Sequence, residues 1–210
     1  VITYVDTEDK VDGKQSVRAQ TSQLAGMLAA GNRFTGQFAG LVGTSGGKVN
    51  FGRPWTSRPS ALKLYCKYST GTIDIINSTP PGVTLTKSDY DRAQIKIALG
   101  TWDYKKYGGT LESPVHINTT DASTFVDFTT DPSTVADGNL IIHHDGYYLN
   151  GGDKVAAETG EWIEYVIPLN YHSMDVQPTH IIVSCASSQF GDYFTGCSSS
   201  KLWIDRKSVV

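Results

Sequence analysis

The 210-residue chain has few cysteines, no long apolar run and no strong excess of charge of either sign. Its three cysteines, Cys66, Cys185 and Cys197, lack the paired spacing of zinc or thiol-redox sites, and at most Cys185 and Cys197 form one bridge. Three buried thiols are the favoured interpretation, because free cysteine is among the most buried residue types. The longest mainly apolar stretch, residues 24–30, is far below the roughly 20 residues of a membrane-spanning helix.

The charge balance excludes further classes. Lys and Arg number 18 against 21 Asp and Glu, which gives a formal net charge of −3 and no basic footprint for nucleic acid or an anionic membrane. Aromatic residues make up 10% of the chain, a content that disordered proteins do not reach. The sequence begins at Val1 without Met and without a charged and apolar leader, so we expect a trimmed chain whose targeting signal was removed.

The residues that are abundant favour strands and turns. Ser and Thr supply roughly a fifth of the chain, and Tyr is frequent. In residues 61–68 and 92–99 apolar side chains recur at every second position, with mainly polar residues between them, as in half-buried strands. Further strands are predicted at residues 15–21, 33–38, 124–128, 139–144, 161–167, 180–185 and 201–205. Only residues 22–30 indicate a possible helical turn.

About nine short strands with little helix predict an all-β protein, an antiparallel β-sandwich of the jelly-roll type. No repeat or linker is visible, so residues 1–210 are expected to form a single domain. The alternation also predicts which side chains lie between the sheets. They are Leu62, Leu64, Ile95, Ile97, Ile163, Ile167, Ile181, Val183, Leu202 and Ile204.

Two segments resemble a known family. One runs from Phe51 through Gly52-Arg53-Pro54 to Tyr68, and the other contains Phe190-Gly-Asp-Tyr-Phe-Thr-Gly196 and is followed by Leu202-Trp-Ile-Asp205. Both are similar to the putative carbohydrate metabolism domain of Bacteroidetes surface proteins, over roughly residues 15–205. The resemblance implies a jelly roll like that of carbohydrate-binding modules. It also implies export as part of an outer-membrane lipoprotein that handles glycans.

Calcium is a cofactor that such jelly rolls often hold between their first and last strands, using oxygen ligands. The family closes with several acidic residues, of which this chain keeps only Asp205. Asp6, Glu8 and Asp9 are further carboxylates near the start. A structural calcium ion is therefore a doubtful expectation, and no other cofactor is expected.

Glycan recognition needs exposed aromatic rings beside hydrogen-bonding groups, and two places fit this requirement. The first is formed by two turn-rich segments, which we expect at the surface. Its residues are Trp102, Asp103, Tyr104, Tyr107, Tyr147, Tyr148 and Asn150. In the alternative interpretation, Trp102 and one of the adjacent tyrosines fill an end of the sandwich. The second candidate is a sheet face with Tyr65 and Trp162 pointing outward together with Gln94 and Lys96.

Catalytic and metal sites are less well supported. A glycoside hydrolase needs two carboxyl groups flanking the scissile bond, and Asp103, Glu112, Asp127 and Asp192 could meet only through folding. His143, His144 and Asp145 are consecutive, and neighbouring side chains of a strand point to opposite faces, so no metal site is expected there. Arg58 is expected to form an ion pair with a carboxylate such as Asp192.

The sequence thus predicts a module that binds polysaccharide or oligosaccharide at the cell surface through stacking and hydrogen bonds, without covalent chemistry. Other outer-membrane glycan-uptake proteins are possible partners, and nucleic acid is not. A glycoside hydrolase or lyase is the enzymatic alternative. A structural, adhesin-like module is the third interpretation.

Overall fold

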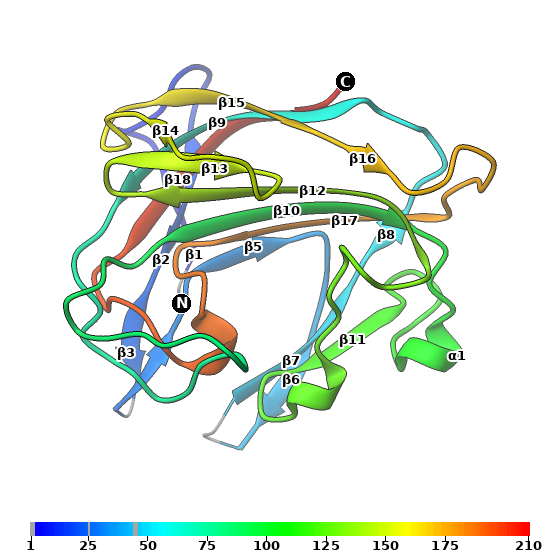
Figure 1. Cartoon of the computed structure of the whole chain (residues 1–210), viewed down its shortest axis with the longest axis horizontal. Coiled ribbons are helices and arrows are strands. Elements are labelled where there is room, and N and C mark those ends of the chain that lie inside the picture. The colour runs from blue at the N-terminus through cyan, green and yellow to red at the C-terminus, as the bar shows by residue number, and fades with distance from the viewer. Residues whose placement is uncertain (1–2, 25, 44–45) are drawn as a thin grey trace.

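The computed structural model describes residues 3–24, 26–43 and 46–210, and its regular structure is almost entirely β (Figure 1). Every strand pairing within these residues is antiparallel. The predicted antiparallel β-sandwich is confirmed. None of the described helices is long and apolar enough to cross a bilayer.

The first layer is a five-stranded sheet. Its order is β1 (Thr3–Asp6), β2 (Ser16–Gln20), β18 (Lys201–Val209), β9 (Ala61–Ser69) and β15 (Ile163–Pro168). The last strand is therefore paired between two early ones, and the register of β18 against β9 shifts between Asp205 and Ser208. Arg206 has φ 49° within this bulge.

The second layer is an eight-stranded sheet. Its order is β14 (Val155–Ala156), β13 (Gly146–Leu149), β12 (Thr134–His143), β10 (Ala93–Gly100), β17 (His180–Ala186) and β5 (Asn32–Phe34). Two short strands complete it, β16 (Asn170–Tyr171) beside β12 and β8 (Arg53–Pro54) beside β17. The two large sheets lie face to face (Figure 1).

Smaller elements surround this sandwich. A three-stranded sheet has the order β11 (Val115–Asn118), β7 (Gly46–Phe51) and β6 (Gly36–Val42). A hairpin joins β3 (Ser22–Leu24) to β4 (Met27–Ala29). The helices are short: α1 (Tyr104–Tyr107) and two 3-10 helices, η1 (Ala122–Thr124) and η2 (Gly191–Tyr193).

The core between the large sheets is the predicted one. Nine of its ten predicted side chains are buried in a single cluster, and Ile163 is partly buried against it. Cys66 and Cys185 belong to the same cluster, and burial raises the pKa of both thiols, that of Cys185 to about 12. Cys197 is also buried and all three cysteines are free, so the bridge left open by the sequence does not form.

Two local predictions are wrong. Residues 22–30 form the β3–β4 hairpin in place of a helical turn; Ala25 lies outside the described residues. Residues 124–128 form no strand, because aspartates set the backbone into turns on both sides of this segment. The Asp121 carboxylate accepts from the Ser123 N–H, and the Asp127 carboxylate accepts from the Thr129 N–H.

Candidate functional site

The outer face of the eight-stranded sheet changes character along its strands. On β10 the outward side chains are Gln94, Lys96 and then Ala98, and their neighbours on β17 are Ala186, Ser184 and Ile182. Ala98 and Ile182 are buried in a second apolar cluster with Val115, Ile117 and Phe128. The three-stranded sheet thus covers the apolar end of this face, and the polar end stays open.

The open end forms a cleft of about 480 Å³, within the usual range of ligand sites. Its floor includes Gln94, Lys96 and Ser184 from β10 and β17, and its walls come from loops and from the three-stranded sheet. A smaller hollow of about 150 Å³ shares Gln94, Lys96, Asp127 and Phe128 with it and extends to β12. Together they make a polar-floored groove, which we call the cleft.

Two loops with a similar local sequence pattern line the cleft. One reads Phe125-Val-Asp-Phe128 and the other Phe190-Gly-Asp-Tyr193, so each has an aspartate flanked by aromatic residues. The rings of Phe125 and Tyr193 meet edge to face with centroids 5.5 Å apart. Both rings are half-buried, whereas Asp127 and Asp192 are exposed. The cleft therefore combines aromatic surface with two carboxylates.

A buried carboxylate holds the second of these loops in place. Asp91 is 2% exposed, and its Oδ2 accepts hydrogen bonds from the hydroxyls of Ser188 and Ser200 and from the Cys197 N–H. Gly191 permits the close approach of this loop to Ala30, the residue after β4, because a Cβ at Gly191 would lie 2.2 Å from the Cβ of Ala30. The wall that carries Asp192 and Tyr193 is thus anchored from both sides.

Several polar side chains of the cleft are not committed to the protein. Within residues 3–24, 26–43 and 46–210, the side-chain ammonium of Lys96 forms no hydrogen bond or ion pair. Asn32 and Gln189 line the cleft, and each has a buried amide oxygen without a donor. Buried polar groups nearly always find a partner in folded proteins, so a water molecule or a ligand group is expected beside these two oxygens.

Asp192 has an unusual electrostatic position. Asp192 lines the cleft, where the surrounding protein reduces the solvation of its carboxyl group and raises its pKa above the ordinary 3.8. The positive charge of Lys96 acts in the opposite direction and lowers this pKa. Among the residues that the structure describes, none forms a hydrogen bond with the Asp192 carboxylate. A carboxyl group with a raised pKa beside an unpaired lysine is typical of functional sites.

The first sequence-predicted site does not form as expected. Trp102 is 2% exposed in the second apolar cluster, its indole donates to Asp131, and its ring lies edge-on to Phe128. A Cβ at Gly100 would lie 2.5 Å from the indole, so the ring packs directly on the sheet. An indole buried in this way has no face for a sugar, and Trp102 instead packs on the outer face of the eight-stranded sheet within the second apolar cluster.

The remaining residues of that site are dispersed. Trp102 comes two residues after Gly100, the end of β10. Tyr147 pairs with Ile142 of β12, and Ile142 pairs with Ala93, the start of β10. The two aromatic segments therefore lie at opposite ends of β10. Tyr147 packs edge to face on Tyr165 in the core. Asn150 uses its side chain on backbone groups of Asn139 and Pro168.

The other members are local to α1 or to β13. Asp103 caps α1 by accepting from the Lys105 N–H, and the Tyr107 hydroxyl donates to Asp131. Tyr104 is half-buried at the start of α1, and Tyr148 is half-buried on β13 with no contact to α1 among the described interactions.

The second predicted face is divided between two sheets. Tyr65 and Trp162 belong to the five-stranded side, where Tyr65 pairs with Glu164 across β9 and β15, and the Trp162 indole donates to Asp9. Gln94 and Lys96 lie on the other sheet and line the cleft. Arg58 also differs from expectation, because it donates to the carbonyls of Val176 and Ser173 and does not reach Asp192.

The carboxylates considered for calcium are occupied by donors of the protein. Asp6 accepts from the N–H groups of Glu8 and Asp9 and from the Trp203 indole, and these bonds lower its pKa. Asp205 accepts from the N–H groups of Val11 and Asp12. Asp9 accepts from Trp162 and Lys67. These hydrogen bonds tie the first and last strands to the segment between β1 and β2.

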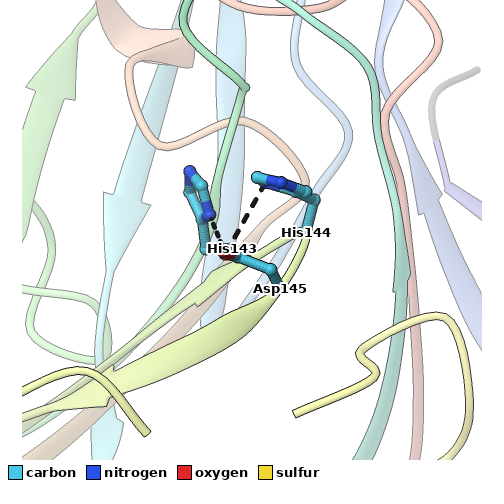
Figure 2. A group of neighbouring side chains, drawn as sticks. All are labelled: His143, His144 and Asp145. Atoms are coloured by element: carbon cyan, nitrogen blue, oxygen red, sulfur yellow. Dashed lines mark hydrogen bonds and ion pairs between the residues drawn. The ribbon is translucent and has the colours of Figure 1, made fainter. Parts of the chain in front are cut away.

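The expected divergence of His143 and His144 is wrong. Strand β12 ends at His143, and His144 and Asp145 form the two-residue turn into β13, where the alternation of a strand no longer applies (Figure 2). The two rings lie 4.3 Å apart between centroids, and His143 Nδ1 donates to Asp145 Oδ1 at 2.5 Å. Burial and the neighbouring His143 lower the pKa of His144.

The cleft contains residues that the sequence analysis did not assign to a site, chiefly Asn32, Phe125, Gln189 and Tyr193. The repeated Phe-x-Asp-aromatic pattern was the available signal, because each copy places a carboxylate and two rings within four residues. Asp127 and Asp192 stand in the sequence analysis among the carboxylates that folding could bring into a pair, and Asp192 also as a partner for Arg58.

Comparison with known proteins agrees with this architecture. The model of the putative carbohydrate metabolism domain family matches residues 3–210. A putative glycoside hydrolase from Bacteroides thetaiotaomicron is similar in structure, with a TM-score of 0.65 and 20% identity, over 100% of this chain and 57% of that one. A second, from Bacteroides vulgatus, has a TM-score of 0.61 and 18% identity, over 100% of this chain and 77% of that one.

The chain thus spans little more than half the length of the first of these structures, and at such identities the likeness concerns the fold alone. No curated protein matches it by sequence. The match of the family model over nearly the whole chain shows that the protein belongs to the putative carbohydrate metabolism domain family.

Proposed function

We propose that this domain binds an oligosaccharide or a segment of polysaccharide in the cleft, without covalent chemistry. The observation that carries the proposal is the combination of half-buried aromatic rings with uncommitted polar side chains on one floor and two walls. Phe125 and Tyr193 offer apolar surface to a sugar ring. The Lys96 ammonium has free hydrogen-bonding capacity for its hydroxyls, and Asn32 and Gln189 line the same cleft.

The family relationship supports a carbohydrate ligand, and the names of the two similar structures point in the same direction. Export to the cell surface, where polysaccharides are met, and work beside other outer-membrane glycan-handling proteins complete the proposal. In this setting the domain would hold a glycan for a neighbouring protein.

The test starts with a polysaccharide panel in affinity electrophoresis, followed by calorimetry with oligosaccharides of any retained polymer. Tyr193→Ala removes the half-buried ring of one wall and is expected to weaken binding several-fold, by about 1 kcal/mol. Tyr65→Ala is the matched control, because it removes the same side chain from the outer face of the five-stranded sheet. Its affinity should equal that of the unmodified protein.

The reverse result would contradict the cleft as the binding site. Weakening by Tyr65→Ala without an effect of Tyr193→Ala would assign binding to the opposite sheet. If both variants bind with the affinity of the unmodified protein, neither ring stacks on the sugar. Melting temperatures of both variants are measured beside the affinities, so that a loss of folding is recognised.

Hydrolysis of the same ligand is the second candidate function, and one observation favours it. Asp127 and Asp192 both line the cleft, and the raised pKa of Asp192 suits a proton donor, as the acid of a glycosidase requires. Release of reducing ends from a bound polymer, abolished in Asp127→Asn and in Asp192→Asn, would establish hydrolysis. Retention of the polymer without release supports a binding module.

A further inference from the structure

We propose that His143, His144 and Asp145 form a binding site for a divalent transition metal of the zinc type at the β12–β13 turn. Their potential ligand atoms, one from each residue, all lie within 4.8 Å of one another. Among the residues that the structure describes, this is the one group of three or more such side chains gathered so closely. Figure 2 shows both rings rising from the turn on the same side, with Asp145 at their base.

The two-residue turn is what brings these ligands together. Leu140 to His143 on β12 pair with Leu149 to Gly146 on β13, so His144 and Asp145 alone connect the strands. The Gly146 backbone has φ 159°, and a Cβ there would lie 2.3 Å from the Val155 carbonyl oxygen, so β14 packs against the turn. The ligands thus sit on a hairpin whose backbone is fixed by pairing on both sides.

The neighbouring side chains fix the ligands further. The Tyr90 ring stacks on His144 with centroids 3.7 Å apart and planes 16° apart, and it meets the edge of His143. Lys154 bonds the second carboxylate oxygen of Asp145, which leaves Oδ1 directed at the two rings. Such outer contacts are what commonly orient the ligands of metal sites.

The donor set decides the kind of metal. Two imidazole nitrogens and one carboxylate oxygen suit zinc and its neighbours in the first transition row, whereas calcium and magnesium prefer a shell of oxygens alone. Three protein ligands leave at least one coordination position for water. The side chains of His143, His144 and Asp145 are 21%, 36% and 48% exposed, so an ion can enter from solvent.

Binding requires a small rearrangement with a clear balance. The metal takes the place of the proton between His143 Nδ1 and Asp145 Oδ1, and Nε2 of the ring carries the proton instead, by exchange with solvent, so that His143 stays a neutral imidazole. The ion then joins β12 to the turn and adds stability to the folded state alone. The site lies outside the residues that line the cleft, so this proposal does not depend on the proposed function.

Calorimetric titration of the protein, prepared without a histidine tag, with zinc chloride tests the site. We expect saturable binding of one ion and a rise in melting temperature, with neither effect from calcium or magnesium. His144→Ala should lower the zinc affinity about tenfold or more, since even outer partners of metal ligands matter by that factor. His116→Ala is the matched control, because it removes one imidazole from β11, which belongs to a different sheet from the β12–β13 turn.

Three results would overturn the proposal. They are the absence of saturable zinc binding, an unchanged affinity in His144→Ala, and an equal loss in His144→Ala and His116→Ala, which would indicate scattered binding to surface imidazoles. Because all three proposed ligands reach solvent, the variant is expected to fold. Its melting temperature without metal verifies this before the titration.

Discussion

The two ends of the outer face of the eight-stranded sheet use the same strands in opposite ways. At one end Ala98 and Ile182 are buried under the three-stranded sheet, together with Trp102. At the other end, two residues along the same strands, Lys96 and Ser184 face the open cleft. The change of two side chains from apolar to polar therefore separates a stabilising contact from a binding surface on one continuous scaffold.

Removing the largest ring at the closed end should have the largest effect. Trp102→Ala empties a buried site and removes one of the donors to Asp131, so we expect a loss of about 3–5 kcal/mol of unfolding free energy in urea denaturation. Trp102→Phe keeps most of the volume and should retain polysaccharide as the unmodified protein does. A stable Trp102→Phe variant that no longer binds would show that the indole contacts the ligand after all.

A pair of substitutions on β17 compares the two ends directly. Ile182→Ala at the closed end should cost about 2–5 kcal/mol, because it leaves a cavity in the second cluster. Ser184→Ala, on the same face of the same strand, should change stability by less than about 0.5 kcal/mol, because it removes a cleft hydroxyl. Equal costs in denaturation would mean that the open end is as tightly packed as the closed one.

The smallest expected effect concerns the charge in the cleft. The pKa of Asp192 is raised in the folded protein, so the folded state favours the protonated carboxyl. At neutral pH, where the carboxyl is ionised, Asp192 therefore lowers the free energy of unfolding. Asp192→Asn should therefore be slightly more stable than the unmodified protein at pH 7. The difference should shrink as the pH falls through the raised pKa and vanish below 3.8. Destabilisation by Asp192→Asn at pH 7 would instead reveal a structural bond of this carboxylate.

The fold followed from the sequence where side chains alternate over a whole strand. Leu62 and Leu64 on β9 are separated by Lys63, and Ile95 and Ile97 on β10 are separated by Lys96, and a strand that buries one face admits one arrangement of them. The same alternation placed Gln94 and Lys96 outward, correctly. It could not show that these two residues and Tyr65 lie on different sheets, because the order of strands depends on long-range pairing.

The candidate site was harder to predict because it depends on loops. Trp102 was assigned to the surface for following a strand, yet Gly100 lets its ring fold back onto the sheet. Phe125 and Tyr193 meet across more than sixty residues of sequence, and no local pattern indicates such a contact. At His143 the strand rule was applied one residue too far, since the strand ends there and the turn begins.

The division of the cleft into a floor of strands and walls of loops has a consequence for engineering and for divergence. The reverse sides of the floor strands build the sandwich core, whereas the two Phe-x-Asp-aromatic segments contribute mainly to the walls. Loops that carry binding residues tolerate substitution at their exposed positions better than at their buried ones. One scaffold could thus acquire new glycan preferences by substitution at the exposed and half-buried positions of residues 122–128 and 190–194, with the buried Phe128 and Phe190 retained and Asp91 kept as the anchor of the second loop.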